Sequence, residues 1–127
     1  MKTIKQLEAY GREVIKKLNL SHWDITFKVL KEDEGVFIAN NYRLFNYKES
    51  TVSFKKSIFK EKELFIKETV IHELLHCHFG FWDTHIKAHL YEDANISSSA
   101  YSKLNKSISD AEEESVSILA RSLARII

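Results

Sequence analysis

The segment HELLHCHF, residues 72–79, places two histidines four positions apart, with a glutamate directly after the first. Residues four apart on an α-helix lie on one face, separated by roughly 6 Å along the axis. His72 and His76 can therefore each direct an imidazole nitrogen at one ion, at the roughly 2.0–2.1 Å that zinc requires. Glu73 is turned about 100° from His72, so its carboxylate would lie beside the ion and could take a proton from a metal-bound water. The alternative interpretation is that the histidines are polar residues at the edge of an ordinary helix.

Length and composition indicate a globular chain with one core. The sequence has 127 residues, of which 44% are hydrophobic and 29% charged, and its formal net charge is +1. A chain of this length buries roughly two thirds of its unfolded surface, so we expect residues 1–127 to form a single domain. A near-neutral charge supplies no field that would gather nucleic acid or acidic lipid, so we expect no nucleic-acid partner.

The cysteine content and the N-terminal sequence favour a cytoplasmic location. Cys77 is the single cysteine and cannot form an internal disulfide. Glu8, Arg12 and Glu13 interrupt the apolar residues near the N-terminus, so we expect no signal peptide. No stretch approaches the roughly 18 consecutive apolar residues that suggest a membrane span, and we expect no membrane partner.

The spacing of apolar residues in the first half of the chain predicts a helix followed by a small sheet. Helical spacing predicts an amphipathic helix over residues 3–18. Alternation of apolar and polar residues then predicts about three strands over residues 23–55. We expect the turns between these strands near residues 32–35 and 47–50.

The second half of the chain is expected to be mainly helical, which makes the fold class α+β. After Ser57 the helical spacing returns, and HELLH lies on the last turns of a helix that ends at Gly80 as a C-cap. The buried stripe of that helix is predicted to consist of Leu64, Ile71, Leu74 and Leu75. Residues 84–91 are predicted to form a short helix, and the serine-rich residues 93–107 a loop. A last helix is predicted from Asp110 to Ile126.

A catalytic zinc ion needs a third protein ligand and an open fourth position. A histidine with metzincin spacing would stand at position 82, which is Trp82. His85 and His89 form a second pair at helical spacing, although exposed histidine pairs are usually solvated. The glutamates of DAEEESVSILARSLARII, residues 110–127, are the other candidates.

Among these glutamates, Glu113 is favoured over Glu112 as the third ligand. Both extend the apolar stripe of the last helix, whereas Glu114 falls on its polar side. A carboxylate on a core-facing stripe needs a partner, because burying an unpaired charge is costly, and zinc would be that partner. Ser109 and Glu112 match a capping box, and acidic residues suit the first turn of a helix. Capping would account for Glu112, which leaves Glu113 as the preferred ligand and Glu112 as the alternative.

The combination of these residues resembles the gluzincin pattern. A helical glutamate, Glu113, follows His76 after 36 intervening residues. The order of helix, strands, HELLH helix and glutamate helix is similar to the minimal zincin peptidases of phages and mobile elements, including the ImmA/IrrE-like family, over residues 23–127. In gluzincins an aspartate often stands where this chain has Ser117. SprT-like zincins are also similar in HELLH, but their third ligand is a histidine, which only His85 or His89 could supply.

The resemblance implies a zinc-dependent metallopeptidase, a hydrolase that acts on a protein or peptide substrate. Glu73 would be the general base, and an extended substrate would pair with an edge strand of the sheet, expected at residues 50–55. Tyr91 and Tyr101 are candidates for stabilising the developing oxyanion. His78 points away from the zinc face, and Cys77 is expected to be a small core residue.

A binding or regulatory module with a structural zinc ion is the alternative function. In such a protein zinc would only tie two helices together. Glu73 discriminates between the two functions, because a structural site has no need of a carboxylate there and usually closes its fourth position with Cys or His.

Overall fold

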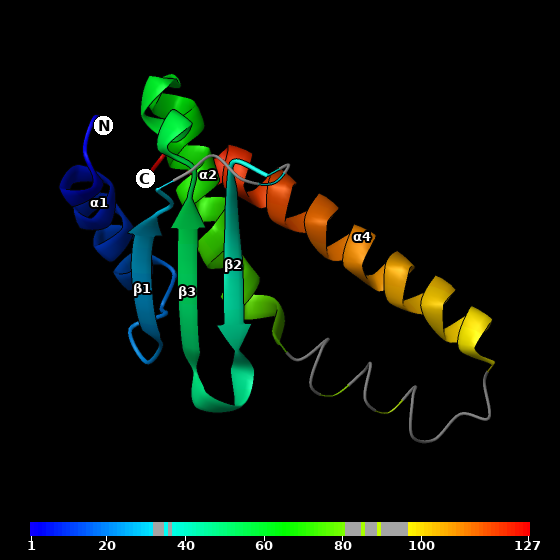
Figure 1. The fold of residues 1–127 in the computed structure, drawn as a ribbon. Helices are drawn as coiled ribbons and strands as arrows, with labels where there is room; N and C mark the ends of the chain where they lie inside the picture. Colours follow the sequence, from blue (N-terminus) through cyan, green and yellow to red (C-terminus); the bar gives the residue numbers. More distant parts are fainter. Residues whose placement is uncertain (32–34, 36, 81–84, 86–88, 90–96) are drawn as a thin grey trace.

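The computed structural model describes residues 1–31, 35, 37–80, 85, 89 and 97–127 (Figure 1). Over this part of the chain the fold is α+β, as expected. Its helices are α1 (Ile4–Lys17), α2 (Glu63–Leu75) and α4 (Ser98–Leu123), and its strands are β1 (Asp24–Val29), β2 (Ala39–Leu44) and β3 (Glu49–Phe54). Short 3₁₀ turns lie at η1 (Phe45–Tyr47), η2 (Lys56–Lys60) and η3 (His76–Phe79). The expected turn at 32–35 and the expected short helix at 84–91 fall largely outside the described residues.

The three strands form a mixed sheet in the order β1-β3-β2. β1 runs parallel to β3, and β2 runs antiparallel to β3, so Val52 of β3 lies opposite Phe27 on one side and Asn41 on the other. The expectation that residues 50–55 form an edge strand is therefore wrong, because β3 is the central strand. The tight connection at Lys48, which has a φ of 52°, closes the β2–β3 hairpin and leaves β2 at the edge.

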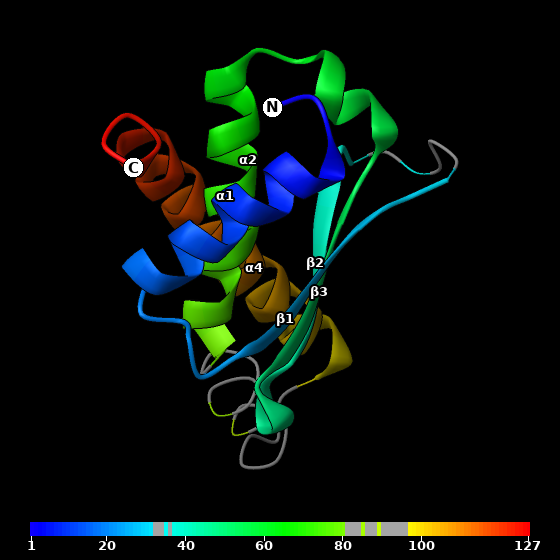
Figure 2. The same cartoon turned by 90° about the vertical axis from the view of Figure 1, so that its left-hand side faces the viewer.

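Helices α1 and α2 lie on one face of the sheet, as Figure 2 shows edge-on, and α4 packs against α2. Alternating residues of β1 and β3, among them Ile25, Val52 and Phe54, are buried against these helices. The helices contribute the buried side chains Leu7, Val14, Ile66, Val70, Ile71, Leu74 and Val116. Leu64, expected in the buried stripe of α2, is 45% exposed, because it lies in the first turn, before the helix passes under the sheet.

The helix predicted at residues 3–18 is confirmed. Thr3 is its N-cap and accepts a hydrogen bond from the backbone N–H of Gln6, and such a side-chain acceptor satisfies one of the unpaired donors of a first helical turn. Lys16 and Lys17 lie in the last turn, where positive charge suits the helix dipole. None of the helices in the described ranges is long and apolar enough to cross a membrane.

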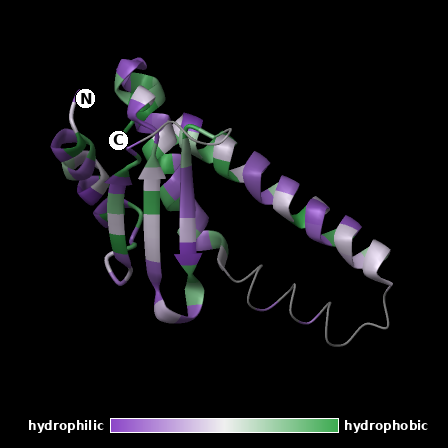
Figure 3. Cartoon of the chain, in the orientation of Figure 1, coloured by the Kyte–Doolittle hydropathy of each residue, from purple (hydrophilic) through white to green (hydrophobic). Residues whose placement is uncertain are grey.

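Helix α4 is longer than predicted. It begins at Ser98, and Ser97 is its N-cap, whose hydroxyl accepts from the N–H of Ala100 at 3.1 Å. The expectation of a loop at 93–107 is therefore wrong for the described residues from 98 onward, and Ser109 lies inside the helix, where it is no cap. The first half of α4 extends away from the sheet and is largely polar in Figure 3. Tyr101, Leu104 and Ile108 recur there at helical spacing, but the serine-rich sequence around them favoured a loop.

The end of α2 also differs from the expectation. The α-helix ends at Leu75 and continues as the 3₁₀ turn η3, and Gly80 has ordinary right-handed helical angles, so it is not a left-handed C-cap. A Cβ atom at Gly80 would collide with the ring of Phe45. Glycine at this position is therefore explained by the close approach of an aromatic ring and not by a special backbone conformation.

Candidate metal centre

The candidate site lies where α2 meets α4. His72 comes from α2 and His76 opens η3, and because His76 keeps right-handed helical angles, the two imidazoles remain on one helical face. Glu113 approaches them from α4. The Nε2 atoms of His72 and His76 are 3.2 Å apart. The Glu113 carboxylate places Oε1 3.0 Å from Nε2 of His76 and Oε2 3.2 Å from Nε2 of His72.

These separations fit the dimensions of a tetrahedral zinc site. With zinc bonds of roughly 2.0–2.1 Å, neighbouring ligand atoms of a tetrahedron are separated by about 3.4 Å. The two Nε2 atoms are 3.2 Å apart, slightly less than such an edge, and the two Glu113 oxygens lie 3.0 and 3.2 Å from one Nε2 atom each. His72, His76 and Glu113 are also the group in the described part of the chain whose ligand atoms come close enough together to hold one metal ion.

Glu112 faces the opposite side of His76. Its Oε1 lies 2.8 Å from Nδ1 of His76 and 2.6 Å from Nη1 of Arg43. Burial raises the pKa of Glu112, but the hydrogen bonds from His76 and Arg43 and the charge of Arg43 outweigh burial and bring that pKa to about 2. Glu112 is therefore a carboxylate at neutral pH, so Nδ1 of His76 must donate to it.

The contacts of Glu112 differ from those that the sequence predicted. It was expected to be a helix cap or an alternative ligand. It is not a cap, because α4 starts about four turns earlier, and it is Glu113 whose carboxylate lies within 3.2 Å of both Nε2 atoms. A carboxylate that accepts from the second nitrogen of a histidine fixes the tautomer and orientation of the ring.

The tautomer of His76 decides whether the cluster can bind a metal ion. If Nδ1 carries the hydrogen, Nε2 of His76 presents a lone pair, and this lone pair faces the Glu113 carboxylate at 3.0 Å. Two electron-rich atoms at this distance repel unless a proton or a metal ion lies between them. Burial lowers the pKa of His72, which favours its neutral form with a free lone pair. The arrangement favours a bound cation.

Ser117 stands on α4 one turn after Glu113. Its hydroxyl lies 3.4 Å from Nδ1 of His72, which is at the long end of a hydrogen bond. The gluzincin resemblance leads us to expect an aspartate here. Serine supplies a weaker, neutral partner at the same position, so His72 is held less firmly than His76.

Glu73 lies next to the cluster, on the buried side of α2. The residue is 7% exposed, and burial, its largest perturbation, raises the pKa of its carboxyl group to about 7. Its backbone carbonyl accepts a hydrogen bond from Nδ2 of Asn41 at 2.6 Å, which ties this turn of α2 to strand β2. Glu73 thus has the firm backbone and the raised pKa that suit a group exchanging protons near neutral pH.

Two hollows meet at the cluster, and both are lined by Phe37, Ala39, His72, Glu73 and Glu113. The first has a volume of about 300 Å³ and extends between α2 and α4, where Phe65, Thr69 and Ala120 line it. The second has a volume of about 400 Å³ and follows β2, where Asn40, Asn41 and Arg43 line it. Together they form a continuous cleft along the sheet edge, with the cluster at its centre.

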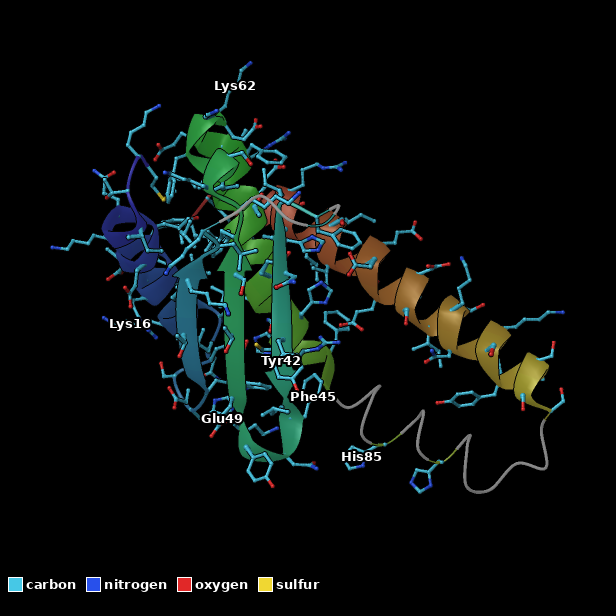
Figure 4. The ribbon with its side chains drawn as sticks, viewed as in Figure 1. Lys16, Tyr42, Phe45, Glu49, Lys62 and His85 are labelled. Carbon is cyan, nitrogen blue, oxygen red and sulfur yellow. The ribbon has the colours of Figure 1, made fainter. Side chains whose placement is uncertain are left out.

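The remaining candidates from the sequence lie away from the cluster or outside the described residues. His85 and His89, the second histidine pair, are both exposed. Figure 4 shows His85 beyond the end of η3 and away from α4. Tyr101 precedes Glu112 by 11 residues on α4, about 16 Å along the axis, which is too far to stabilise an oxyanion. Tyr91 and Trp82 lie outside the described residues.

Sequence reasoning missed Asn41 and Arg43, which contact the backbone of the HELLH turn. The signal was present in ANNYRL of β2, where Ala39, Asn41 and Arg43 alternate with exposed residues. Cys77 is buried, and its Sγ lies 3.5 Å from Nδ2 of Asn41. Nε2 of His78 contacts the carbonyl of Leu18 at the end of α1, so both residues lie outside the cluster, as expected.

Comparison with known proteins gave no match to any family model, curated protein or solved structure.

Proposed function

We propose that this protein is a zinc-dependent peptidase with a minimal zincin-type fold, acting in the cytoplasm. His72, His76 and Glu113 would hold the ion. The observation that carries the proposal is the convergence of the two Nε2 atoms and the Glu113 carboxylate, whose oxygens lie 3.0 and 3.2 Å from them, with the second nitrogen of His76 already hydrogen-bonded to Glu112.

Zinc held by these residues would act as a Lewis acid toward a peptide carbonyl and would make a water reactive at neutral pH. Glu73 would accept a proton from that water while the water oxygen bonds to the carbonyl carbon of the substrate. The same carboxyl group then delivers the proton to the amine nitrogen as the carbon–nitrogen bond breaks. A raised pKa of about 7 supports both roles, because the group exchanges its proton readily near neutral pH.

The cleft along the sheet edge suits an extended peptide. β2 is an edge strand of the described sheet and lines the second hollow through Asn40 and Asn41, so a substrate strand could pair with its backbone. The first hollow, lined by Phe65, Thr69 and Ala120, would receive one side chain of that substrate. We therefore propose that the substrate pairs with β2, and not with residues 50–55, which form the central strand.

The test is hydrolysis of a mixture of unstructured peptides by the zinc-loaded protein, analysed by mass spectrometry. We expect cleavage by the wild type and none by Glu73→Gln, with zinc bound equally by both. Glu114→Gln is the matched control, since Glu114 is exposed and lines neither hollow. Zinc binding without cleavage by any variant would instead support the binding-module function.

A further inference from the structure

We infer that Arg43 is a positioning residue for the metal centre, which holds Glu112 in place as the hydrogen-bond acceptor that orients His76. The inference rests on the proposed metal centre and is independent of whether the protein cleaves peptides. Arg43 lies on β2, far in sequence from both partners. Its Nη1 donates to the backbone carbonyl of His76 and, at 2.6 Å, to Oε1 of Glu112.

The contacts of Arg43 and His76 converge on a single oxygen. Oε1 of Glu112 receives Nη1 of Arg43 at 2.6 Å and Nδ1 of His76 at 2.8 Å. The guanidinium therefore does not displace the imidazole but occupies the second acceptor position of the same oxygen. A neutral carboxyl group in this place would carry a hydrogen of its own and would be a weaker acceptor.

Burial makes the charge of Arg43 necessary. The side chains of Arg43, Glu112 and His76 are 15%, 6% and 10% exposed. A carboxylate this deeply buried is costly without a cation beside it, and a metal ion bound at Nε2 of His76 would lie on the other side of the imidazole. Arg43 therefore balances the charge of Glu112 independently of the metal ion.

Arg43 itself is held by an aromatic platform. Its guanidinium carbon lies 4.7 Å from the centre of the Phe45 ring, and Phe45 packs edge-on against Trp23 at 5.6 Å. Figure 4 labels Phe45 at the end of β2, close to the end of α2, where the absence of a side chain at Gly80 leaves room for the ring. A lysine at position 43 would keep the charge but lose the planar stacking and the fixed geometry of two donations.

The consequence is that both ends of His76 are fixed from the edge strand. The backbone carbonyl is held by Arg43 directly, and the ring is held through Glu112. Nε2 is thereby directed at Nε2 of His72 and at Glu113, at 3.2 and 3.0 Å. Losing the partner that orients a metal-binding histidine lowers metal affinity by roughly 10- to 100-fold.

The experiment is a double-variant cycle on zinc affinity, measured by competition with a chromophoric chelator. Arg43→Met and Glu112→Gln should each weaken zinc binding by roughly 10- to 100-fold. The combined variant should bind within two-fold of Glu112→Gln, because a neutral amide no longer needs the guanidinium. Losses that multiply in the combined variant, or an Arg43→Met affinity within two-fold of wild type, would overturn the inference.

The matched control is Arg12→Met. Arg12 also pairs with a glutamate, Glu8, at 3.2 Å and lies over a phenyl ring, Phe27, at 5.2 Å, but on α1. Its zinc affinity should equal that of the wild type. If Arg43→Met does not fold, Arg43→Lys replaces it, with an expected affinity below that of wild type.

A second readout separates this inference from the proposed function. Long-range ¹H–¹⁵N NMR of the metal-free protein should show a hydrogen on Nδ1 of His76, hydrogen-bonded to Glu112 at 2.8 Å, and Arg43→Met or Arg43→Lys should weaken this signal. If the wild type binds no zinc, the proposed metal centre fails, whereas the NMR result still decides whether Arg43 orients the His76 ring. An unchanged signal in these variants would contradict this role.

Discussion

Glu112 and Glu113 are adjacent in the sequence but contact opposite nitrogens of the same imidazole. Oε1 of Glu112 lies 2.8 Å from Nδ1 of His76, and Oε1 of Glu113 lies 3.0 Å from Nε2. α4 runs across α2 so that His76 fits between two consecutive side chains. Glu112 is buried and paired with Arg43, whereas the Glu113 side chain is 59% exposed. Their different surroundings predict different effects of the same substitution.

Glu113→Gln should weaken zinc binding far more than Glu112→Gln. Glu113→Gln replaces a proposed carboxylate ligand with an amide, which is a poor zinc ligand. Glu112→Gln only weakens the hydrogen bond that orients His76, which should lower zinc affinity by roughly 10- to 100-fold. Chelator competition on both variants measures the difference. Glu114→Gln is the control, since Glu114 is the next, exposed residue of α4. Equal losses in Glu112→Gln and Glu113→Gln would contradict the assignment of roles.

Glu73→Gln should separate binding from catalysis. Glutamine keeps the shape of the side chain and leaves the proposed ligands in place, so zinc affinity should change by less than about three-fold. Peptide hydrolysis should fall by roughly 10²- to 10⁴-fold, as is usual when a general base is removed. Steady-state rates of both proteins with one cleaved peptide test this, and a Glu73→Gln variant that retains full activity would remove Glu73 from the mechanism.

Gly80→Ala should destabilise the fold, although alanine normally stabilises a helical position. The backbone of Gly80 is right-handed, so propensity alone predicts a gain of up to about 1 kcal/mol. The collision with Phe45 reverses the sign, and overpacking of this kind costs about 1–3 kcal/mol. Urea unfolding measures the change. Adding Phe45→Leu should recover part of the loss, and a stable Gly80→Ala single variant would show that the ring can move away.

Tyr10→Phe should leave stability unchanged or raise it by up to about 1 kcal/mol at pH 7. The Oη atom of Tyr10 is the buried side-chain oxygen in the described residues that has no hydrogen-bond partner. Removing it leaves no polar group unsatisfied. Urea midpoints of the two proteins at pH 7 provide the comparison, and a loss above 1 kcal/mol would reveal a partner for this hydroxyl.

The stabilities of the wild type and of Tyr10→Phe should diverge at alkaline pH. Burial, and then the charge of Glu63, raise the pKa of Tyr10 from 10.0 to about 12. The phenol then ionises in the unfolded chain first, so the wild type should lose stability as pH rises from about 10 to about 12. Tyr10→Phe should lose less over this range. Parallel pH profiles would mean that Tyr10 ionises equally in both states.

The sequence predicted the parts of the site that depend on local spacing. His72, Glu73 and His76 were predicted from the period of 3.6 residues on one helix. The same period placed Glu112 and Glu113 on the apolar stripe of the last helix, and Glu113 was preferred because a helix cap would account for Glu112. The placement of β3 could not be predicted in this way. Alternation along a strand indicates which side chains face the core, but not which strands lie beside it.

The alternation in β2 puts Arg43 on the same face as Ala39, but the partner of Arg43 and the contacts of Glu112 could not be predicted from the sequence. Arg43 and Glu112 are 69 positions apart, and their contact depends on how α4 crosses the end of β2. An arginine in a short strand is predicted to lie at the surface unless its buried partner is known. Glu112 was attributed to a helix cap because the serine-rich residues before it were predicted to be a loop and Ser109 and Glu112 match a capping box.

Zinc content of the purified protein, measured by elemental analysis after reconstitution and gel filtration, tests the central claim most directly. The account predicts one zinc ion per chain in the wild type and in Glu73→Gln, and a clear loss in Glu113→Ala. A wild-type protein that retains no zinc would contradict the proposed metal centre. Zinc retained equally by Glu113→Ala would contradict the assignment of Glu113 as the third ligand.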